Sequence, residues 1–121
     1  MTIKLRQEIE IWYIIPAIRR EIAKALVKKG LSQRKVAMKL GLTDAAVSQY
    51  FNSKRGNEVK FSQNIKKEIK DSADRILSGS NVTQEIQKLC RLCHDDGICC
   101  YIHKHHGAPS DCKICFPERD D

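Results

Sequence analysis

The sequence lacks a long apolar run. The longest one spans residues 11–18 and is interrupted by Pro16, whereas a transmembrane helix needs roughly 20 apolar residues. The first ten residues, MTIKLRQEIE, carry charges where a secretory signal peptide would need its apolar segment. We therefore expect a cytoplasmic protein that neither crosses a membrane nor is exported.

Aromatic residues are scarce, at 6% of the 121 residues, and the first 89 residues contain no cysteine. The length suits one modest core with a small appendage and is too short for a large catalytic scaffold. Neither a glycine-rich cofactor motif nor an acid–base constellation accompanies the cysteines. A thiol-based redox enzyme is therefore the weakest alternative, and we expect no enzymatic activity.

Positive charge is concentrated in one part of the chain. Residues 1–79 contain 17 lysines and arginines against 8 acidic residues, whereas residues 80–121 contain 5 against 7. A basic domain of this kind is typical of proteins that bind nucleic acid, although a solvated basic surface has the same composition.

Apolar residues recur at helical spacing in much of the chain, which predicts a mainly α fold. The pattern predicts helices within residues 15–30, 31–41, 42–52 and 61–79, and a further helix within 82–93. Pro16 is expected in the first turn of its helix. Residues 2–15 fit either a helix or a strand, and a helix is favoured, with Trp12 and Tyr13 in the core or in a subunit contact.

Two of these helices are short and are joined by the tripeptide Gly41–Leu42–Thr43. Ser32 and Thr43 are expected to cap their N-termini, and Gly41 is expected to make the turn. Ala37 is the small residue expected where the two helices approach closely. Two short helices linked by a three-residue turn containing glycine are typical of the helix-turn-helix motif.

The segment SQRKVAMKLGLTDAAVSQYFNSKRG resembles the helix-turn-helix of lambda-repressor-like (XRE-type) transcriptional regulators. With the preceding IIPAIRREIAKALVKKG, it is similar to archaeal regulators of that class, including a domain that some archaea fuse to a thiamine-phosphate synthase module. No synthase-like segment follows here, so a thiamine-linked role does not carry over. The resemblance covers residues 12–56 and implies a helical bundle that binds double-stranded DNA.

The resemblance also implies that the helix starting at Thr43 enters the major groove with its N-terminus first. Asp44 fits either a contact to cytosine or a first-turn acid that is favoured by the helix dipole. The residues expected to contact bases are Thr43, Asp44, Ala45, Ser48 and Gln49. The residues expected to contact phosphates are Gln33, Arg34, Lys54 and Arg55.

All six cysteines and all four histidines lie between residues 89 and 116. We expect a boundary in the stretch SGSN that separates a helix-turn-helix domain, residues 1–79, from a small metal-stabilised cysteine-rich module, residues 80–121. Two C-x-x-C pairs are typical of metal ligands, and a reducing cytosol disfavours disulfides. The expected ligands are Cys90, Cys93, Cys100, Cys112 and Cys115, with Cys99 and His103 as weaker candidates and His105 and His106 weaker still.

Zinc and an iron–sulfur cluster both fit this pattern. Zinc would be satisfied by the two C-x-x-C pairs, whereas a [4Fe–4S] cluster tolerates longer loops between its ligands and leaves Cys100 as an exchangeable one. Similar archaeal regulators carry a cysteine-rich tail, and iron–sulfur sensors recur among DNA-binding regulators. The resemblance therefore favours the cluster, with zinc as the alternative.

These observations lead to three hypotheses. The favoured one is a homodimeric DNA-binding regulator whose affinity for DNA depends on an iron–sulfur cluster, as a redox or iron–sulfur sensor. The second is a regulator with a permanent zinc module that serves dimerisation or partner docking. The third is the thiol enzyme. Dimerisation is expected because a single helix-turn-helix unit buries little DNA surface.

Overall fold

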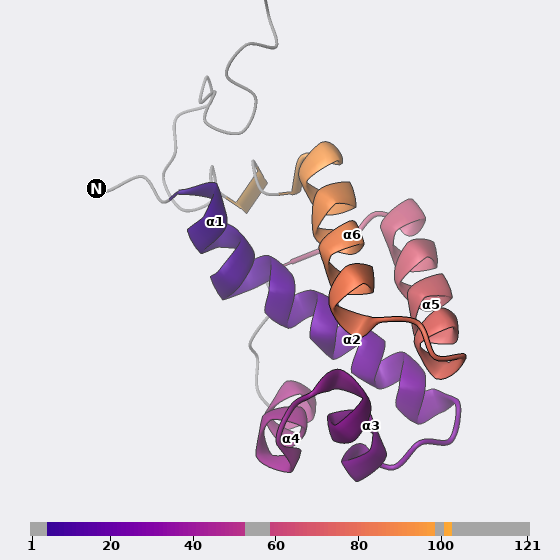
Figure 1. Ribbon diagram of the computed structural model, residues 1–121. Coiled ribbons are helices and arrows are strands. Elements are labelled where there is room, and N and C mark those ends of the chain that lie inside the picture. The colour runs from indigo at the N-terminus through magenta and orange to yellow at the C-terminus, as the bar shows by residue number, and fades with distance from the viewer. Residues whose placement is uncertain (1–4, 53–58, 99–100, 103–121) are drawn as a thin grey trace, which may run out of the picture.

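The structure is a computed structural model that describes residues 5–52, 59–98 and 101–102. It is a bundle of helices, and no strand occurs within these ranges, so the predicted mainly α fold is confirmed. One long rod runs diagonally through the molecule, with a pair of short helices below it and a helical hairpin beside it (Figure 1). The elements are α1 (Arg6–Ile9), η1 (Glu10–Ile14), α2 (Ile15–Lys28), α3 (Gln33–Leu40), α4 (Asp44–Asn52), α5 (Gln63–Leu77) and α6 (Val82–Asp95).

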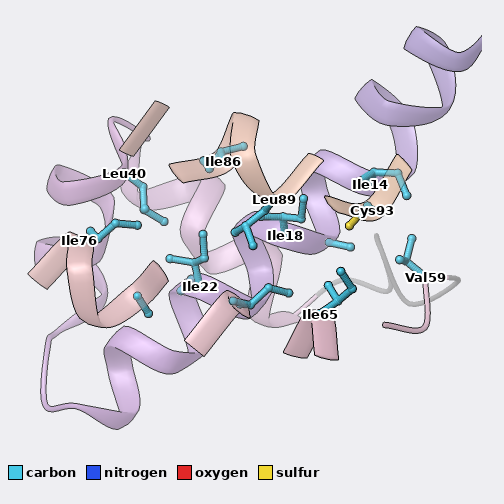
Figure 2. Close-up of a cluster of buried hydrophobic side chains, with 14 of the residues drawn as sticks. Ile14, Ile18, Ile22, Leu40, Val59, Ile65, Ile76, Ile86, Leu89 and Cys93 are labelled. Carbon is cyan, nitrogen blue, oxygen red and sulfur yellow. The ribbon is translucent and has the colours of Figure 1, made fainter. Parts of the chain in front are cut away.

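Helix α2 lies at the centre of the bundle. Its apolar residues recur three and four positions apart, so they share one face, and Ile18, Ile22 and Leu26 on that face are fully buried. Helices α3, α4, α5 and α6 all contact α2. Figure 2 shows Ile18 and Ile22 among side chains contributed by the other helices. The predicted apolar faces of residues 15–30 and 61–79 are therefore confirmed as core.

Pro16 lies in the first turn of α2, as the sequence predicted, but the helical segment does not start there. The chain is already helical from Arg6, and α1, η1 and α2 form one continuous rod (Figure 1). The turn just before the proline is a π-helix, in which the N–H of Ile15 donates to the carbonyl of Glu10. A proline inside a helix has no N–H to donate and crowds the preceding turn. The wider π-turn makes room for the proline ring, so the helix continues through the proline.

Trp12 lies outside the core, which removes the first of its two predicted roles, core residue or subunit contact. Its side chain is 48% exposed, and that of Ile11 is 57% exposed. The core positions of this segment are Ile9 and Ile14, both fully buried, while Tyr13 is half-buried against the core. The spacing of five residues between Ile9 and Ile14 follows from the π-turn that separates them. A subunit contact through Trp12 stays a prediction.

The predicted domain boundary falls in the turn between α5 and α6. The hydrophobic core is continuous across this turn, because Ile86, Leu89 and Cys93 of α6 belong to the same buried cluster as Ile18 and Ile22 (Figure 2). Farther along, Ile98 and Ile102 also join that cluster. The described start of the cysteine-rich part is thus packed into the helical bundle.

A charged network joins α5 to α6. The guanidinium of Arg75 donates to both carboxylate oxygens of Glu85 over 3.0–3.2 Å. The hydroxyl of Ser72, which is fully buried, donates to Glu85 over 2.8 Å and accepts from Arg75 over 3.1 Å. The hydrogen bonds from Arg75, and then the one from Ser72, hold the pKa of Glu85 below its ordinary value, against the opposing effect of burial. The network fixes how α6 is oriented against α5.

This network predicts a pH dependence of stability. The pKa of Glu85 is lower in the folded state than in the unfolded chain. The stabilisation that its carboxylate gives the fold is therefore complete above the ordinary carboxyl pKa of about 4.5, and it is lost as pH falls through the lower folded value. Glu85→Gln should lower the midpoint temperature of unfolding by several degrees at neutral pH, and the difference from the native protein should narrow in acid. Circular dichroism melts between about pH 7 and pH 3 measure this.

Glu21→Gln is the matched control for this experiment. The side chain of Glu21 makes no hydrogen bond or ion pair to any other residue that the structure describes, so its replacement should leave the dependence of stability on pH almost unchanged. A difference between Glu85→Gln and the native protein that stays constant down to about pH 3 would contradict the role assigned to the ionised carboxylate.

Candidate nucleic-acid interface

Helices α3 and α4 are defined by capping interactions that the sequence predicted. The hydroxyl of Ser32 accepts from the N–H of Lys35 over 3.2 Å, and that of Thr43 accepts from Ala46 over 3.0 Å. Between the helices, Gly41 adopts a left-handed conformation with φ 68°, which glycine tolerates best. The N–H of Leu42 then donates to the carbonyl of Ala37 over 2.9 Å. These bonds end α3 and, after three intervening residues, begin α4.

The buried faces of the two helices hold them together and against α2. Val36, Ala37 and Leu40 of α3 are buried, as are Val47 and Tyr50 of α4. Ala37 is only 1% exposed, in agreement with its predicted place at the close approach of the two helices. Helices of eight and nine residues are too short to persist alone, so this burial is what fixes their positions.

The opposite face of α4 is polar and open to solvent. Thr43, Asp44, Ala45 and Gln49 are exposed, and Ser48 is half-buried. All five were predicted to contact bases, and the structure brings them together on the N-terminal and outer part of one short helix. The hydroxyl oxygen of Thr43 accepts the N-cap hydrogen bond, and its hydroxyl hydrogen is still available to be donated to another group. Asp44 lies in the first turn of α4, which is consistent with both interpretations of its role.

Asn52 belongs to the same face and was missed by the sequence analysis. It is exposed, and its side-chain amide donates to the hydroxyl of Ser48 over 3.2 Å. Asparagine can make a bidentate pair with adenine, and its contact with Ser48 orients both side chains. The spacing of four residues between Ser48 and Asn52 was the available signal, because residues four apart lie on one side of a helix.

Of the residues that were predicted to contact phosphates, those that the structure describes lie at the start of α3. Gln33 and Arg34 are exposed there, followed by Lys35 and Lys39, which are also exposed on α3. Unpaired backbone N–H groups and the helix dipole make such an N-terminus favourable for anions. The predicted Lys54 and Arg55 lie outside the described residues.

Two of the predicted metal ligands lie on α6. Cys93 is fully buried in the core, and Cys90 is half-buried beside a cavity that Glu10, Arg91 and His94 also border. Burial raises the pKa of the Cys90 thiol to about 11, and the nearby charge of Glu10 adds to this effect. No cluster of three or more potential ligands is found among the described residues. The other predicted ligands, Cys99, Cys100, Cys112, Cys115 and His103, lie outside those residues, as do His105 and His106.

Two capped helices with a glycine turn, one buried face and one exposed polar face define the helix-turn-helix class. Residues 22–56, which comprise the second half of α2 together with α3 and α4, match the family model described as helix-turn-helix. This family consists of DNA-binding regulatory proteins and is generally non-enzymatic, and the match supports the resemblance to XRE-type regulators over these residues. Comparison with curated proteins gave no match, and comparison with solved structures gave none either.

Within the described parts of the chain, every helix is either too short or too polar to cross a bilayer.

The close approach of α3 to its neighbours predicts the effect of a larger residue at Ala37. Ala37→Leu inserts methyl groups where the side chain is 1% exposed, and overpacking of this kind costs about 1–3 kcal/mol of unfolding free energy. Met38→Leu is the matched control, because Met38 is 76% exposed and should change stability by less than about 0.5 kcal/mol. Urea unfolding followed by circular dichroism compares the two, and equal effects would refute the assigned packing.

Proposed function

We propose that the protein is a sequence-specific regulator of transcription that binds double-stranded DNA through α3 and α4. The observation that carries this proposal is the division of α4 into two faces. Val47 and Tyr50 are buried against the bundle, while Asp44, Ala45 and Gln49 face solvent. A recognition helix needs this arrangement, because its base-reading side chains must project from a rigid support into the major groove.

The chemistry of the exposed side chains suits base recognition. Gln49 and Asn52 can each pair with the N6 and N7 groups of adenine, and Ala45 can contact a thymine methyl group. Ser48 can donate or accept, and its hydrogen bond to Asn52 couples the two positions. Asp44 would accept from a cytosine amino group where it contacts a base at all.

In this proposal, the start of α3 contacts the phosphate backbone of the DNA. The phosphates would be bound by Arg34, by the side chain of Gln33 and by the free N–H groups of the first turn. These contacts would set the register of α4 on the duplex. Lys54 and Arg55, which follow α4 in the sequence, are proposed to extend these contacts. None of them reads sequence directly, so they determine affinity and its dependence on salt.

We further propose that two copies bind together. One helix-turn-helix unit covers a short half-site, and a twofold dimer would present two recognition helices about 34 Å apart, one turn of B-DNA. The operator would accordingly be a palindrome or near-palindrome.

Two substitutions separate base recognition from phosphate binding. Gln49→Ala should remove about 1–3 kcal/mol of discrimination at one base pair while leaving non-specific binding intact. Arg34→Ala should weaken binding to every sequence and reduce the slope of log affinity against log salt by about 1. A duplex selected from a random pool, titrated by fluorescence polarisation between about 50 and 200 mM salt, measures both effects.

The chain offers a matched control for each variant. Gln87 and Arg91 are exposed residues of α6, on a different helix from the proposed interface, so Gln87→Ala and Arg91→Ala should leave both quantities unchanged. Equal losses in the control variants, or a random-pool selection that enriches no sequence, would contradict the proposed function.

A metal centre in the cysteine-rich part is the second component of the proposal, and the donor chemistry supports it. Cys90 and Cys93 stand three residues apart on α6, and two further cysteine pairs follow them in the sequence. The proposed ligands are Cys90, Cys93, Cys100, Cys112 and Cys115, with Cys99 and His103 as weaker candidates. A [4Fe–4S] cluster would make DNA binding sensitive to oxidants, whereas zinc would stabilise the local fold.

Elemental analysis distinguishes these possibilities. The full chain purified without oxygen should contain iron and sulfide and show broad absorption in the visible range that bleaches in air. Cys112→Ser together with Cys115→Ser should abolish metal content, while Ser110→Ala, a nearby change without a thiol, should not. A colourless protein with about one zinc per chain would reject the cluster, and a protein without either metal would reject both.

A further inference from the structure

A second solvent-accessible groove lies between α2 and α5, with a volume of about 500 Å³. Its floor is apolar and consists of Ala25, Val27, Phe51 and Ile69. Ile69 is buried, Ala25 and Phe51 are half-buried, and Val27 is 37% exposed. The groove reaches the recognition helix α4 only at Phe51, near its C-terminal end. Phe51 lies seven positions after Asp44, or about 10 Å along the helix axis.

Four lysines surround this floor. Lys24 and Lys28 are one turn apart on α2, and Lys66 and Lys70 are one turn apart on α5, so each pair lies on one side of its helix. Of the residues that the structure describes, Glu21 is the one acidic residue that lines the groove. Among the described residues, none of the four lysines has an ion-pair partner.

The same two helices pair opposite charges elsewhere. The ammonium group of Lys29 on α2 forms an ion pair with Asp74 on α5. At the groove, by contrast, lysines from the two helices border the same space. Like charges in proximity repel each other unless an anion lies between them. The arrangement therefore favours an occupant with negative charge.

We propose that this groove binds a small amphipathic anion, an aromatic or acyl carboxylate, with its apolar body on Phe51 and Ile69 and its carboxylate among the lysines. The volume lies within the range of roughly 300–1,000 Å³ that is usual for small-molecule sites. A DNA phosphate would pair with the lysines but would leave the apolar floor in contact with water. A carboxylate with a hydrocarbon body covers both.

The proposed site does not depend on the DNA-binding function, and its test contains no operator. The full chain, labelled with ¹⁵N, is titrated separately with 1-naphthoate, decanoate and the neutral analogue 1-naphthalenemethanol. The amide signals of residues 24–28, 51 and 66–70 should shift and saturate with the two carboxylates. The neutral analogue should bind at the same residues about tenfold more weakly, because it lacks the charge.

Two variants separate the charge from the apolar floor. Lys24→Gln combined with Lys66→Gln should weaken 1-naphthoate binding about fivefold or more, whereas Lys35→Gln combined with Lys39→Gln, which removes the same charge from α3, should change it less than about twofold. Ala25→Phe, which fills the floor, should abolish binding of the carboxylates and the neutral analogue alike. An unchanged pattern of amide signals elsewhere confirms that each variant is folded.

Three outcomes would overturn the proposal. Shifts that do not saturate would show that no site exists. Equal binding of inorganic phosphate and 1-naphthoate would show a simple anion surface that makes no use of the apolar floor. Shifts of the same amides by a random-sequence DNA duplex, with no response to the carboxylates, would assign the lysines to DNA phosphates instead.

Discussion

Burial of the apolar face of α2 is the constraint on which the rest of the bundle depends. Four other helices pack on that face, and none of the shorter ones has enough surface to form a core of its own. The position of α4 is therefore set by what fills the space between it and α2. A change in this core would move the exposed face of α4 even though no exposed residue had been altered.

Some polar side chains make hydrogen bonds that hold the fold together, whereas others have no such structural role. Ser72, Arg75 and Glu85 satisfy one another and join α5 to α6. The hydroxyls of Ser32 and Thr43 satisfy the first turns of α3 and α4. Much of the exposed surface of α4 has no such structural task, which is why its side chains are the ones to which we assign contacts with DNA.

The sequence predicted the helix-turn-helix because its signals are local. Ser32, Gly41 and Thr43 act within three or four residues of their own positions, so their roles follow from spacing alone. The continuous helix through Pro16 was not predictable in the same way, because a first-turn proline usually marks the start of a helix, whereas here a π-turn and the burial of Ile9 and Ile14 continue the helical rod before it. The packing of α6 was not predictable from spacing either, because Ile86, Leu89 and Cys93 join a core whose other residues lie far away in the sequence. The lysine groove depends on residues about forty positions apart, and no local pattern reveals it.

The π-helical turn at Glu10–Ile14 has a consequence for the N-terminal rod. Such a turn holds one residue more than the α-helical turn that it replaces, so it offsets the side-chain register of α1 from that of α2. Each residue of an α-helix advances the chain by about 100° around the axis. Loss of a single residue from this turn would rotate the whole segment before it by that angle, withdraw Ile9 from the core and present a different face to solvent. The face that α1 presents to solvent is thus determined by the number of residues in the turn that follows it.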